Sequence, residues 1–461
     1  MGAEGSARRE LEERIGLWRS YVGGRDAMRQ GDVDELEDHL RNEIAELSAS
    51  GLAPDEAFLV AVKRLGELDD LTREFAREHS DRLWKQLVEP SAAGPDSGVR
   101  SRMEPAVVIG LAVAAALAFK VPSFLGLRLS DDSDETVGFY MRNMSLFVLP
   151  CLFAYFGWKR RFGARQWAFA GIAFATAGTL VNTYPFVNEG QTQILAILHL
   201  PIFLWFVVGV GYTGANWRSN AHWMHFVRFT GELFIYFVLI ALGGGVLTGF
   251  TLMMFQSIGL DAEWLAQDWI VPCGALGAVI VGAWLVEAKQ SVIENMAPVL
   301  TRLFTPLFTV VLLAFIVTMA WTGSAIDVGR GVLIAFDLLL VLVLGLLLYS
   351  VSARDPRARP GYFDVLQLVL VVSALLVDLM ALAAISSRIT EFGFSANKTA
   401  ALGENLVLLI NLSWSAWLYF RFLRGRGPFA ALERWQTAYL PVYAVWAWIV
   451  FAAFPLVFDF A

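Results

Sequence analysis

Charged residues and cysteines are scarce in this chain of 461 residues. Only 17% of the residues are charged, whereas a soluble globular domain has roughly 25%, so the composition excludes an ordinary soluble domain. The two cysteines, Cys151 and Cys273, both lie in apolar stretches without a CxxC or CxxH context. They indicate neither a disulfide framework nor a zinc site.

Several catalytic and nucleotide-binding signatures are also missing. No GxxxxGK(S/T), GxSxG or HExxH motif occurs, so a P-loop ATPase, an ordinary serine hydrolase and a zincin find no support. His222 and His225 are three residues apart, but no Cys or third His lies near them in the sequence. We therefore expect no enzymatic activity, no cofactor and no metal ion.

Hydrophobic residues make up 56% of the chain and are unevenly distributed. Residues 1–103 are heavily charged and carry the whole net charge of −7, while residues 104–461 are close to neutral. The acidity of the first segment argues against direct binding to nucleic acid. We predict a cytoplasmic helical domain at residues 1–88, a flexible linker rich in Pro and Gly at 89–103, and a transmembrane domain at 104–461.

The charged segment predicts a small bundle of four amphipathic helices. Pro54, followed by Asp55 and Glu56, marks the start of the third helix, and Gly66 marks its end. The apolar residues at helical spacing are Leu11, Ile15, Trp18 and Val22, then Val33, Leu36, Leu40, Ile44 and Leu47, then Ala57, Phe58, Ala61, Val62 and Leu65, and finally Leu71 and Phe75.

One stretch of this segment carries a family resemblance. The sequence GDVDELEDHLRNEIAELSASGLAPDEAFLVAVKRLGELDDLTREFARE resembles the small helical permease-prefix domain that precedes bacterial permeases and other membrane proteins. The match covers roughly residues 10–79. It implies a cytoplasmic module that associates with small regulatory proteins, and it assigns no enzymatic role to any residue.

The rest of the chain consists of apolar windows long enough to cross a bilayer. A span needs about 20 apolar residues, and about eleven such windows follow one another, which predicts an all-α polytopic protein. They lie near residues 105–122, 138–157, 167–187, 193–214, 229–256, 269–287, 303–321, 331–352, 363–385, 402–420 and 438–458.

Basic residues sort the connections between these spans. Lys and Arg gather in alternate loops, for example Lys159 and Arg160, whereas Asp134 and Glu135 lie in an opposite loop. By the positive-inside rule the N-terminus is cytoplasmic, and an odd number of spans places the C-terminus outside. We expect a multi-pass protein of the bacterial inner membrane. Gly245 and Gly249 form a GxxxG pattern that allows close helix contact, so homo-oligomerisation stays open.

A second resemblance lies late in the chain. The segment SSRITEFGFSANKTAALGENLVLLINL is similar to part of a domain-of-unknown-function family of polytopic bacterial membrane proteins. It implies a membrane-embedded body and names no substrate or mechanism.

Polar residues inside spans are the best functional indicators, because an ionisable group there costs roughly 2.5–3.5 kcal/mol by insertion scales. Asp337 and Asp378 each lie about 9–12 Å from the outer ends of consecutive antiparallel spans. Arg142, Asn182 and His199 have comparable depths. We predict that these five residues line one cavity open to the outside. A facing Asp pair would form a proton or cation site, and the alternative is that neighbouring polar groups satisfy each aspartate.

Two functions follow from these patterns. The first is a permease, transporter or channel whose membrane body is regulated by the cytoplasmic domain through a protein partner. The alternative is a membrane-anchored sensor or scaffold whose cytoplasmic domain binds a regulatory protein.

Overall fold

The structure is a computed structural model, and almost all the residues that it describes are helical, with no strand among them. The chain divides into two compact units, Met1–Met103 and Glu104–Ala461, called here the N-terminal unit and the membrane unit. The described residues are 11–12, 14–19, 30–50, 52–66, 96–127, 133–214, 217–257, 260, 263–288, 296–322, 330–354 and 358–461.

The N-terminal unit has a hydrophobic core of its own. Helices α2 (Gln30–Ala49) and α3 (Pro54–Gly66) pack with the helical residues 14–19 around Trp18, Leu40 and Phe58, which are almost completely buried. The predicted bounds of the third helix, at Pro54 and Gly66, are confirmed. The predicted fourth helix, at Leu71 and Phe75, lies outside the described residues.

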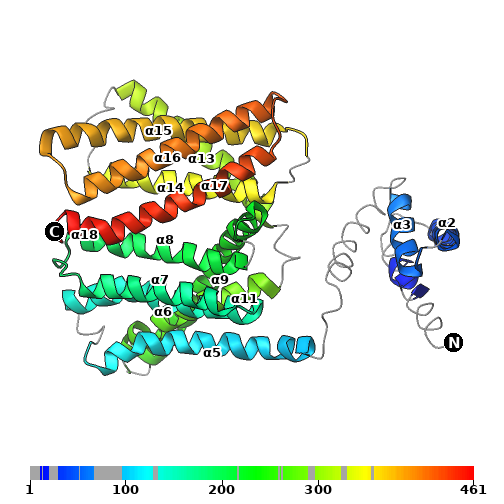
Figure 1. Cartoon of the computed structure of the whole chain (residues 1–461), viewed down its shortest axis with the longest axis horizontal. Coiled ribbons are helices and arrows are strands. Elements are labelled where there is room, and N and C mark those ends of the chain that lie inside the picture. Colours follow the sequence, from blue (N-terminus) through cyan, green and yellow to red (C-terminus); the bar gives the residue numbers. More distant parts are fainter. Residues whose placement is uncertain are drawn as a thin grey trace. The chain divides into compact units, whose positions relative to one another are not determined.

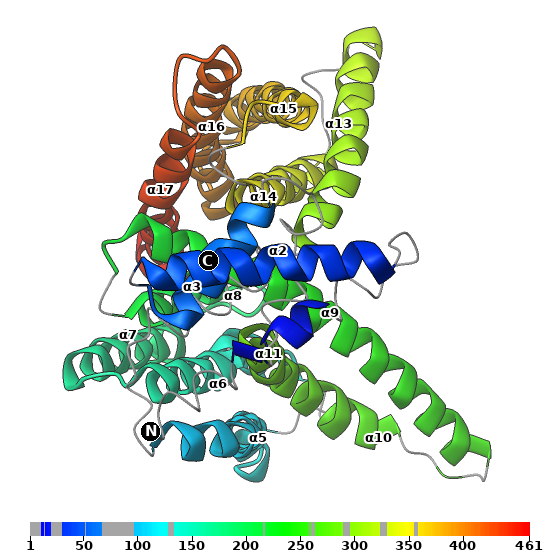
Figure 2. The same cartoon turned by 90° about the vertical axis from the view of Figure 1, so that its right-hand side faces the viewer.

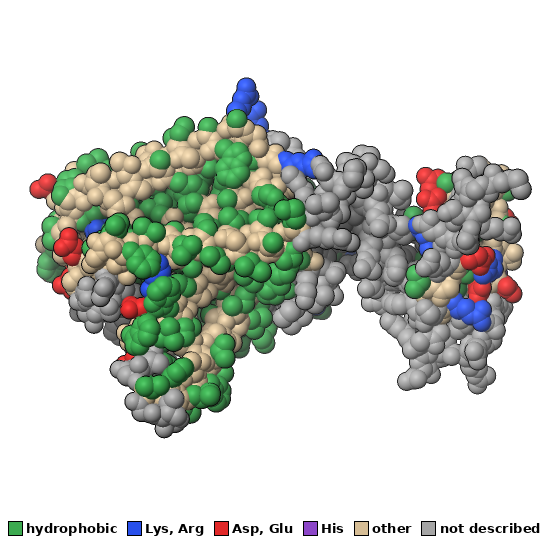
Figure 3. All heavy atoms as spheres, turned by 90° about the horizontal axis from the view of Figure 1, so that it is seen from below, with side chains coloured by type: hydrophobic (Ala, Val, Ile, Leu, Met, Phe, Trp, Pro, Cys, Tyr) green, Lys and Arg blue, Asp and Glu red, His purple; other side chains and the backbone are tan. Residues whose placement is uncertain are grey.

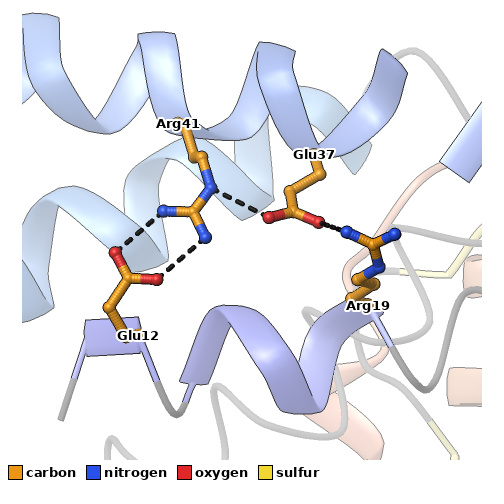
Figure 4. Close-up of polar contacts among 4 residues, drawn as sticks. All are labelled: Glu12, Arg19, Glu37 and Arg41. Carbon is orange, nitrogen blue, oxygen red and sulfur yellow. Dashed lines mark hydrogen bonds and ion pairs between the residues drawn. The ribbon is translucent and has the colours of Figure 1, made fainter. Parts of the chain in front are cut away.

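A polar clamp ties α2 to the preceding helical segment (Figure 4). Arg41 donates to both carboxylate oxygens of Glu12 at 2.8 Å and through Nε to Glu37 at 2.9 Å, while Arg19 donates to the other oxygen of Glu37. The hydrogen bond from Arg41, together with Arg19, lowers the pKa of Glu37 below its ordinary value, although burial acts in the opposite direction. These four residues therefore hold the described residues of the segment 11–19 against α2 in the N-terminal unit.

Helix α5 corrects the predicted linker. It begins at Asp96 and runs to Phe124, so the last part of the segment expected to be flexible is helical, and residues 89–95 lie outside the description. The Pro and Gly content was therefore a poor guide to where this linker ends.

The membrane unit is built from helices that lie side by side (Figure 1). After α5 come α6 (Asp134–Arg160), α7 (Ala164–Thr183), α8 (Gln191–Thr213), α9 (Asn220–Ser257), α10 (Glu263–Leu265) with the π-helix η3 (Ala266–Ile270), α11 (Val271–Ala288), α13 (Met296–Thr322), α14 (Arg330–Ala353), α15 (Tyr362–Phe392), α16 (Ala396–Leu423), α17 (Ala430–Trp448), the π-helix η4 (Ile449–Ala453) and α18 (Phe454–Val457).

Nine helices within the described residues are long and apolar enough to cross a membrane, which identifies a multi-pass membrane protein. They coincide with nine of the eleven predicted spans. The other two predicted spans fall on α7, which is not among the nine, and on α14, whose apolar part within the description is the shorter stretch Asp337–Ala353. Hydrophobic side chains are spread over much of the face of this unit seen in Figure 3, as expected for a surface in contact with lipid.

Two groups of helices form the membrane unit. One core joins α5, α6, α7, α8, α9 and α11, and a second core joins α13, α14, α15, α16 and α17. A smaller cluster links the groups, since Leu195 of α8 packs with Ala400 of α16 and Val450 of η4. The side chain of Gln191 also accepts a hydrogen bond from the backbone N–H of Asn397, at 3.1 Å.

Two features mark opposite ends of these helices. At the end where α6 finishes, Lys159 bonds Glu104 of α5 at 2.9 Å and contacts Glu287 of α11 at 3.3 Å. At the other end, the last residues of the chain bond the connection between α7 and α8, with Val187 donating to Phe460 and Thr192 donating to Ala461. The C-terminus therefore lies beside the α7–α8 connection.

Helices α9 and α13 diverge from the packed helices in the view of Figure 2. The C-terminal half of α9 is largely exposed, and apart from the nearby backbone of α9 itself no described atom comes within 4 Å of a Cβ built at Gly245 or Gly249. The close helix contact that a GxxxG pattern allows is thus not made within the described part of the chain.

A close approach between α16 and α17 gives a test of the packing. A Cβ at Gly403 would lie 1.9 Å from Cη2 of Trp446, so Gly403→Ala should destabilise the folded protein by roughly 1–3 kcal/mol through overpacking. Thermal unfolding of the full-length protein in detergent measures the effect. Gly243→Ala is the matched control, because no described atom lies within 4 Å there. Equal stability of the two variants would contradict the packing.

The polar clamp predicts a pH dependence. Because the folded-state pKa of Glu37 is lowered, its stabilisation is complete above the unfolded value of about 4.3 and is lost as pH falls through the folded pKa. Hydrogen-exchange protection of α2 in the full-length protein should therefore fall on acidification, and Glu37→Gln should lower protection already at neutral pH. Glu46→Gln, an exposed change on the same helix, is the control and should match the unmodified protein. Protection that is unchanged in Glu37→Gln would contradict the role of the clamp.

Candidate functional site

The two aspartates predicted to face each other lie on neighbouring helices of the second group. Asp337 is seven residues into α14, and Asp378 lies between Val377 and Ala381 on the face of α15 that enters the core. Asp337 is close enough to interact electrostatically with Asp378 and also with Glu404 of α16. Asp378 is fully buried, whereas Asp337 and Glu404 are partly exposed, so carboxyl groups from three helices lie within electrostatic range of Asp337.

Asn405 of α16 completes this arrangement. Its amide nitrogen donates to Oδ1 of Asp337 at 3.0 Å and to the backbone carbonyl of Ala401 at 2.8 Å. Both amide hydrogens are therefore used, and the amide oxygen is turned away from these two acceptors. We call the set Asp337, Asp378, Glu404 and Asn405 the acidic cluster.

The acidic cluster contains buried acceptors that nothing in the described chain satisfies. Asp378 is 0% exposed, and neither of its carboxylate oxygens has a hydrogen-bond partner among the described residues. The amide oxygen of Asn405, which is also 0% exposed, is in the same state. A buried polar group without a partner costs roughly 1–3 kcal/mol, and a charged one costs more. The fold holds these atoms at a penalty that packing alone does not explain.

A neighbouring polar network, which shares helix α16 with the acidic cluster, is satisfied. Asn411, two turns further along α16 and equally buried, donates to Oε1 of Gln436 at 3.2 Å and accepts from the hydroxyl of Ser415 at 3.2 Å. This network links α16 to α17 and needs nothing from outside. Several buried polar atoms of the membrane unit lack a partner among the described residues, and Asp378 is the carboxylate for which both oxygens do.

The other three predicted site residues lie in the first helix group. Asn182 of α7 exchanges hydrogen bonds with Asn143 of α6 at 2.7 and 2.9 Å, which is an interhelical pairing. His199 of α8 lies with Nδ1 2.9 Å from the carbonyl oxygen of Leu195. Since a carbonyl only accepts, Nδ1 carries the proton.

Arg142 of α6 packs beside the ring of Phe186, with 5.6 Å between the guanidinium carbon and the ring centre. Its Nε is buried without a partner among the described residues. Of the five predicted residues, the structure thus brings together the two aspartates and holds the remaining three in separate contacts on α6, α7 and α8.

Glu404 and Asn405 were not predicted as site residues. The predicted apolar window begins at residue 402, only two residues before Glu404. The helix itself begins at Ala396, so Glu404 lies about two turns inside it, at a depth similar to that of Asp337. Counting residues from the actual start of the helix, as was done for Asp337 and Asp378, would have identified Glu404 as a polar residue inside a span.

A glycine pattern in α8 resembles a nucleotide-binding motif in spacing only. Gly209, Gly211 and Gly214 match GxGxxG, but they lie at the C-terminal end of a helix, whereas the phosphate-binding motif opens one. A Cβ at Gly211 would lie 2.5 Å from Phe153, and one at Gly209 would lie 2.7 Å from Phe226. These two glycines serve the packing of α8 against α6 and α9.

Within the described residues, no group of three or more His, Cys, Asp or Glu side chains is arranged to hold a metal ion, and this includes the carboxyl groups of the acidic cluster. Cys151 and Cys273 are free thiols. Comparison of the chain with protein-family models, with curated proteins and with solved structures finds no match. The acidic cluster is therefore judged on its own geometry.

The two polar networks predict opposite effects of the same kind of substitution. Asp378→Leu removes a buried acceptor that has no donor, so without a bound ligand the protein should be as stable as before or more stable, by up to about 3 kcal/mol. Asn411→Leu breaks a satisfied network and should lower stability. Thermal unfolding of both variants in detergent tests this. Strong destabilisation by Asp378→Leu would show that Asp378 has a structural partner.

Proposed function

We propose that this chain is an integral membrane protein of permease or channel type in which the acidic cluster binds the cation that moves or drives movement. The observation that carries the proposal is the fully buried carboxylate of Asp378, whose oxygens find no donor in the described chain. Sites of function are where sequences retain such unfavourable features, and ionisable residues inside spans mark ion pathways in membrane proteins.

The negative charges of the acidic cluster link cation binding to the positions of the helices that carry them. Asp337, Asp378 and Glu404 come from three different helices, and their mutual repulsion favours separation of those helices when the cluster is empty. A bound cation neutralises part of this charge and favours their approach. Occupancy of the site therefore biases the relative positions of α14, α15 and α16, which is what a carrier or a gate requires.

The proposed topology has eleven crossings in the bacterial inner membrane, with a cytoplasmic N-terminus and an external C-terminus. Lys159 and Arg160 lie at the end where α5 enters the membrane unit, as the contact with Glu104 requires. Basic residues belong on the cytoplasmic side. The C-terminus lies beside the α7–α8 connection, which is three crossings from the start of α5 and hence on the opposite side.

The N-terminal unit is proposed to regulate this membrane body through a cytoplasmic protein partner. Its separate core around Trp18 and Phe58 supports a module able to keep its own structure, as the permease-prefix resemblance implies. The same observation supports the alternative, a membrane sensor or scaffold. In that case the acidic cluster binds a cation without moving it, and the N-terminal unit passes the signal on.

Ion movement through purified protein tests the proposal. Full-length protein in liposomes on a solid-supported membrane should give currents after a jump in Na⁺, K⁺ or proton concentration. Asp378→Asn should reduce them at least tenfold, because it removes the buried charge. Glu391→Gln changes an exposed carboxylate at the end of the same helix and should leave them unchanged. No current with any of the three cations would overturn transport and favour the sensor.

A further inference from the structure

Helix α5 is attached to the rest of the membrane unit by different contacts at its two ends. Near the start of the span, one carboxylate oxygen of Glu104 accepts hydrogen bonds at 2.9 Å from the Lys159 ammonium and from the Tyr155 hydroxyl, both on α6. Near the other end, the ring of Phe119 packs on the ring of Tyr140, with 4.7 Å between their centres. The Glu104 end is thus held by charge and the Phe119 end by aromatic packing.

Between these two ends the packing of α5 is shallow. Its fully buried residues before Phe119 are Val108 and Ala115, and Ala112 makes only ordinary contact with α11, 3.9 Å from a Cβ built at Gly277. The residues of α5 that are more than half exposed are Ile109, Val113, Leu117 and Val121. Small buried side chains interlock little with neighbouring helices, so the middle of α5 does little to resist a change of tilt.

The ammonium of Lys159 is shared between two carboxylates. Besides Glu104 it contacts Glu287 of α11 at 3.3 Å, and Arg160 also bonds Glu287 at 3.2 Å. Glu287 therefore keeps two cationic partners when Glu104 separates from Lys159. The side chains of Glu104, Lys159 and Arg160 are 21–28% exposed, so water can solvate the charges that separation frees. Separation thus leaves no buried charge unpaired, which is the outcome that would make it costly.

We propose that the contact between Glu104 and Lys159 is a latch, whose opening lets α5 tilt away from α6 and α11 about its Phe119 end. The Tyr140 hydroxyl also donates to the carbonyl of Leu127, just beyond α5, at 2.8 Å, which fixes that end. Fifteen residues at 1.5 Å each place Glu104 about 22 Å from Phe119, so a tilt of about 10° moves Glu104 by about 4 Å. This movement is enough to break its contact with Lys159.

The position of the latch gives the proposed regulation a route. Residues 96–103 of α5 belong to the N-terminal unit and residues 104–124 belong to the membrane unit. A change in the N-terminal unit therefore reaches the latch along one helix. This route rests on the regulatory part of the proposed function, whereas the latch itself rests on contacts within the membrane unit.

Distances between pairs of spin labels, measured by double electron–electron resonance in full-length protein in lipid nanodiscs, test the latch. Cys151 and Cys273 are first replaced by alanine. The four labelled positions, all exposed, are Ala106→Cys with Arg165→Cys for the Glu104 end and Val121→Cys with Met141→Cys for the Phe119 end. Glu104→Ala should raise the share of longer distances at the Glu104 end roughly threefold or more, because an ion pair is lost. Distances at the Phe119 end should stay the same.

Two further variants separate a latch from general loosening. Lys159→Met should open the Glu104 end as Glu104→Ala does, whereas Glu287→Gln should leave it closed, because Glu104 and Lys159 still pair. Glu135→Ala, which changes an exposed carboxylate on α6, is the control and should match the unmodified protein. Equal broadening at both ends, or opening by Glu287→Gln, would overturn the latch.

Salt gives a second readout in the protein without a latch substitution. About 1 M salt shortens the screening length to about 3 Å and should shift distances at the Glu104 end in the same direction. No shift with Glu104→Ala or with salt would overturn the latch and leave the proposed function standing. Opening by Glu104→Ala with unchanged ion currents would support the latch and overturn its place in regulation. Opening in a protein that gives no current would support the latch and overturn transport.

Discussion

A lipid bilayer offers no hydrogen-bond partners, and the membrane unit depends on this constraint throughout. Its helices satisfy their own backbones, and buried side chains such as Asn411 and Gln436 satisfy each other. The carboxylate of Asp378 departs from that rule in a place where the surrounding helices α14, α15 and α16 are tightly packed. Other buried polar atoms of the membrane unit, such as Oε1 of Gln367 on the same helix, also lack a partner among the described residues, but Asp378 is the carboxylate for which both oxygens do.

Hydropathy predicted most of the architecture, since each span must be long and apolar whatever its neighbours are. It placed helices at all eleven expected positions, although only nine meet the criteria for a span within the described residues. Polar positions near helix ends were harder to interpret. The start of α16 at Ala396 comes six residues before the predicted window, and this difference alone concealed Glu404. Asp96 likewise extends α5 into the predicted linker.

The sequence could not predict which polar side chains of different helices meet. The depth of a residue along its helix does not show which neighbouring helix its side chain faces. Asp337 and Arg142 have similar depths, yet one interacts with Asp378 and the other packs on Phe186 in the first helix group. Asn405 has the residue type and place of an ordinary interhelical hydrogen-bonding group. It does join α16 to α14, but through the carboxylate of Asp337, which gives the same contact a second meaning. The glycines of α8 show the reverse case, a motif spacing explained by aromatic packing.

The indole of Trp446 has a mechanical consequence for the acidic cluster. It lies against the backbone of α16 at Gly403, the residue immediately before Glu404 and Asn405. Trp446 itself is on α17, three residues before the π-helix η4. Close contact between a flat ring and bare backbone opposes sliding of α17 along α16 at this point. The position of α17 along its own axis is thereby tied to the turn of α16 that carries Glu404 and Asn405.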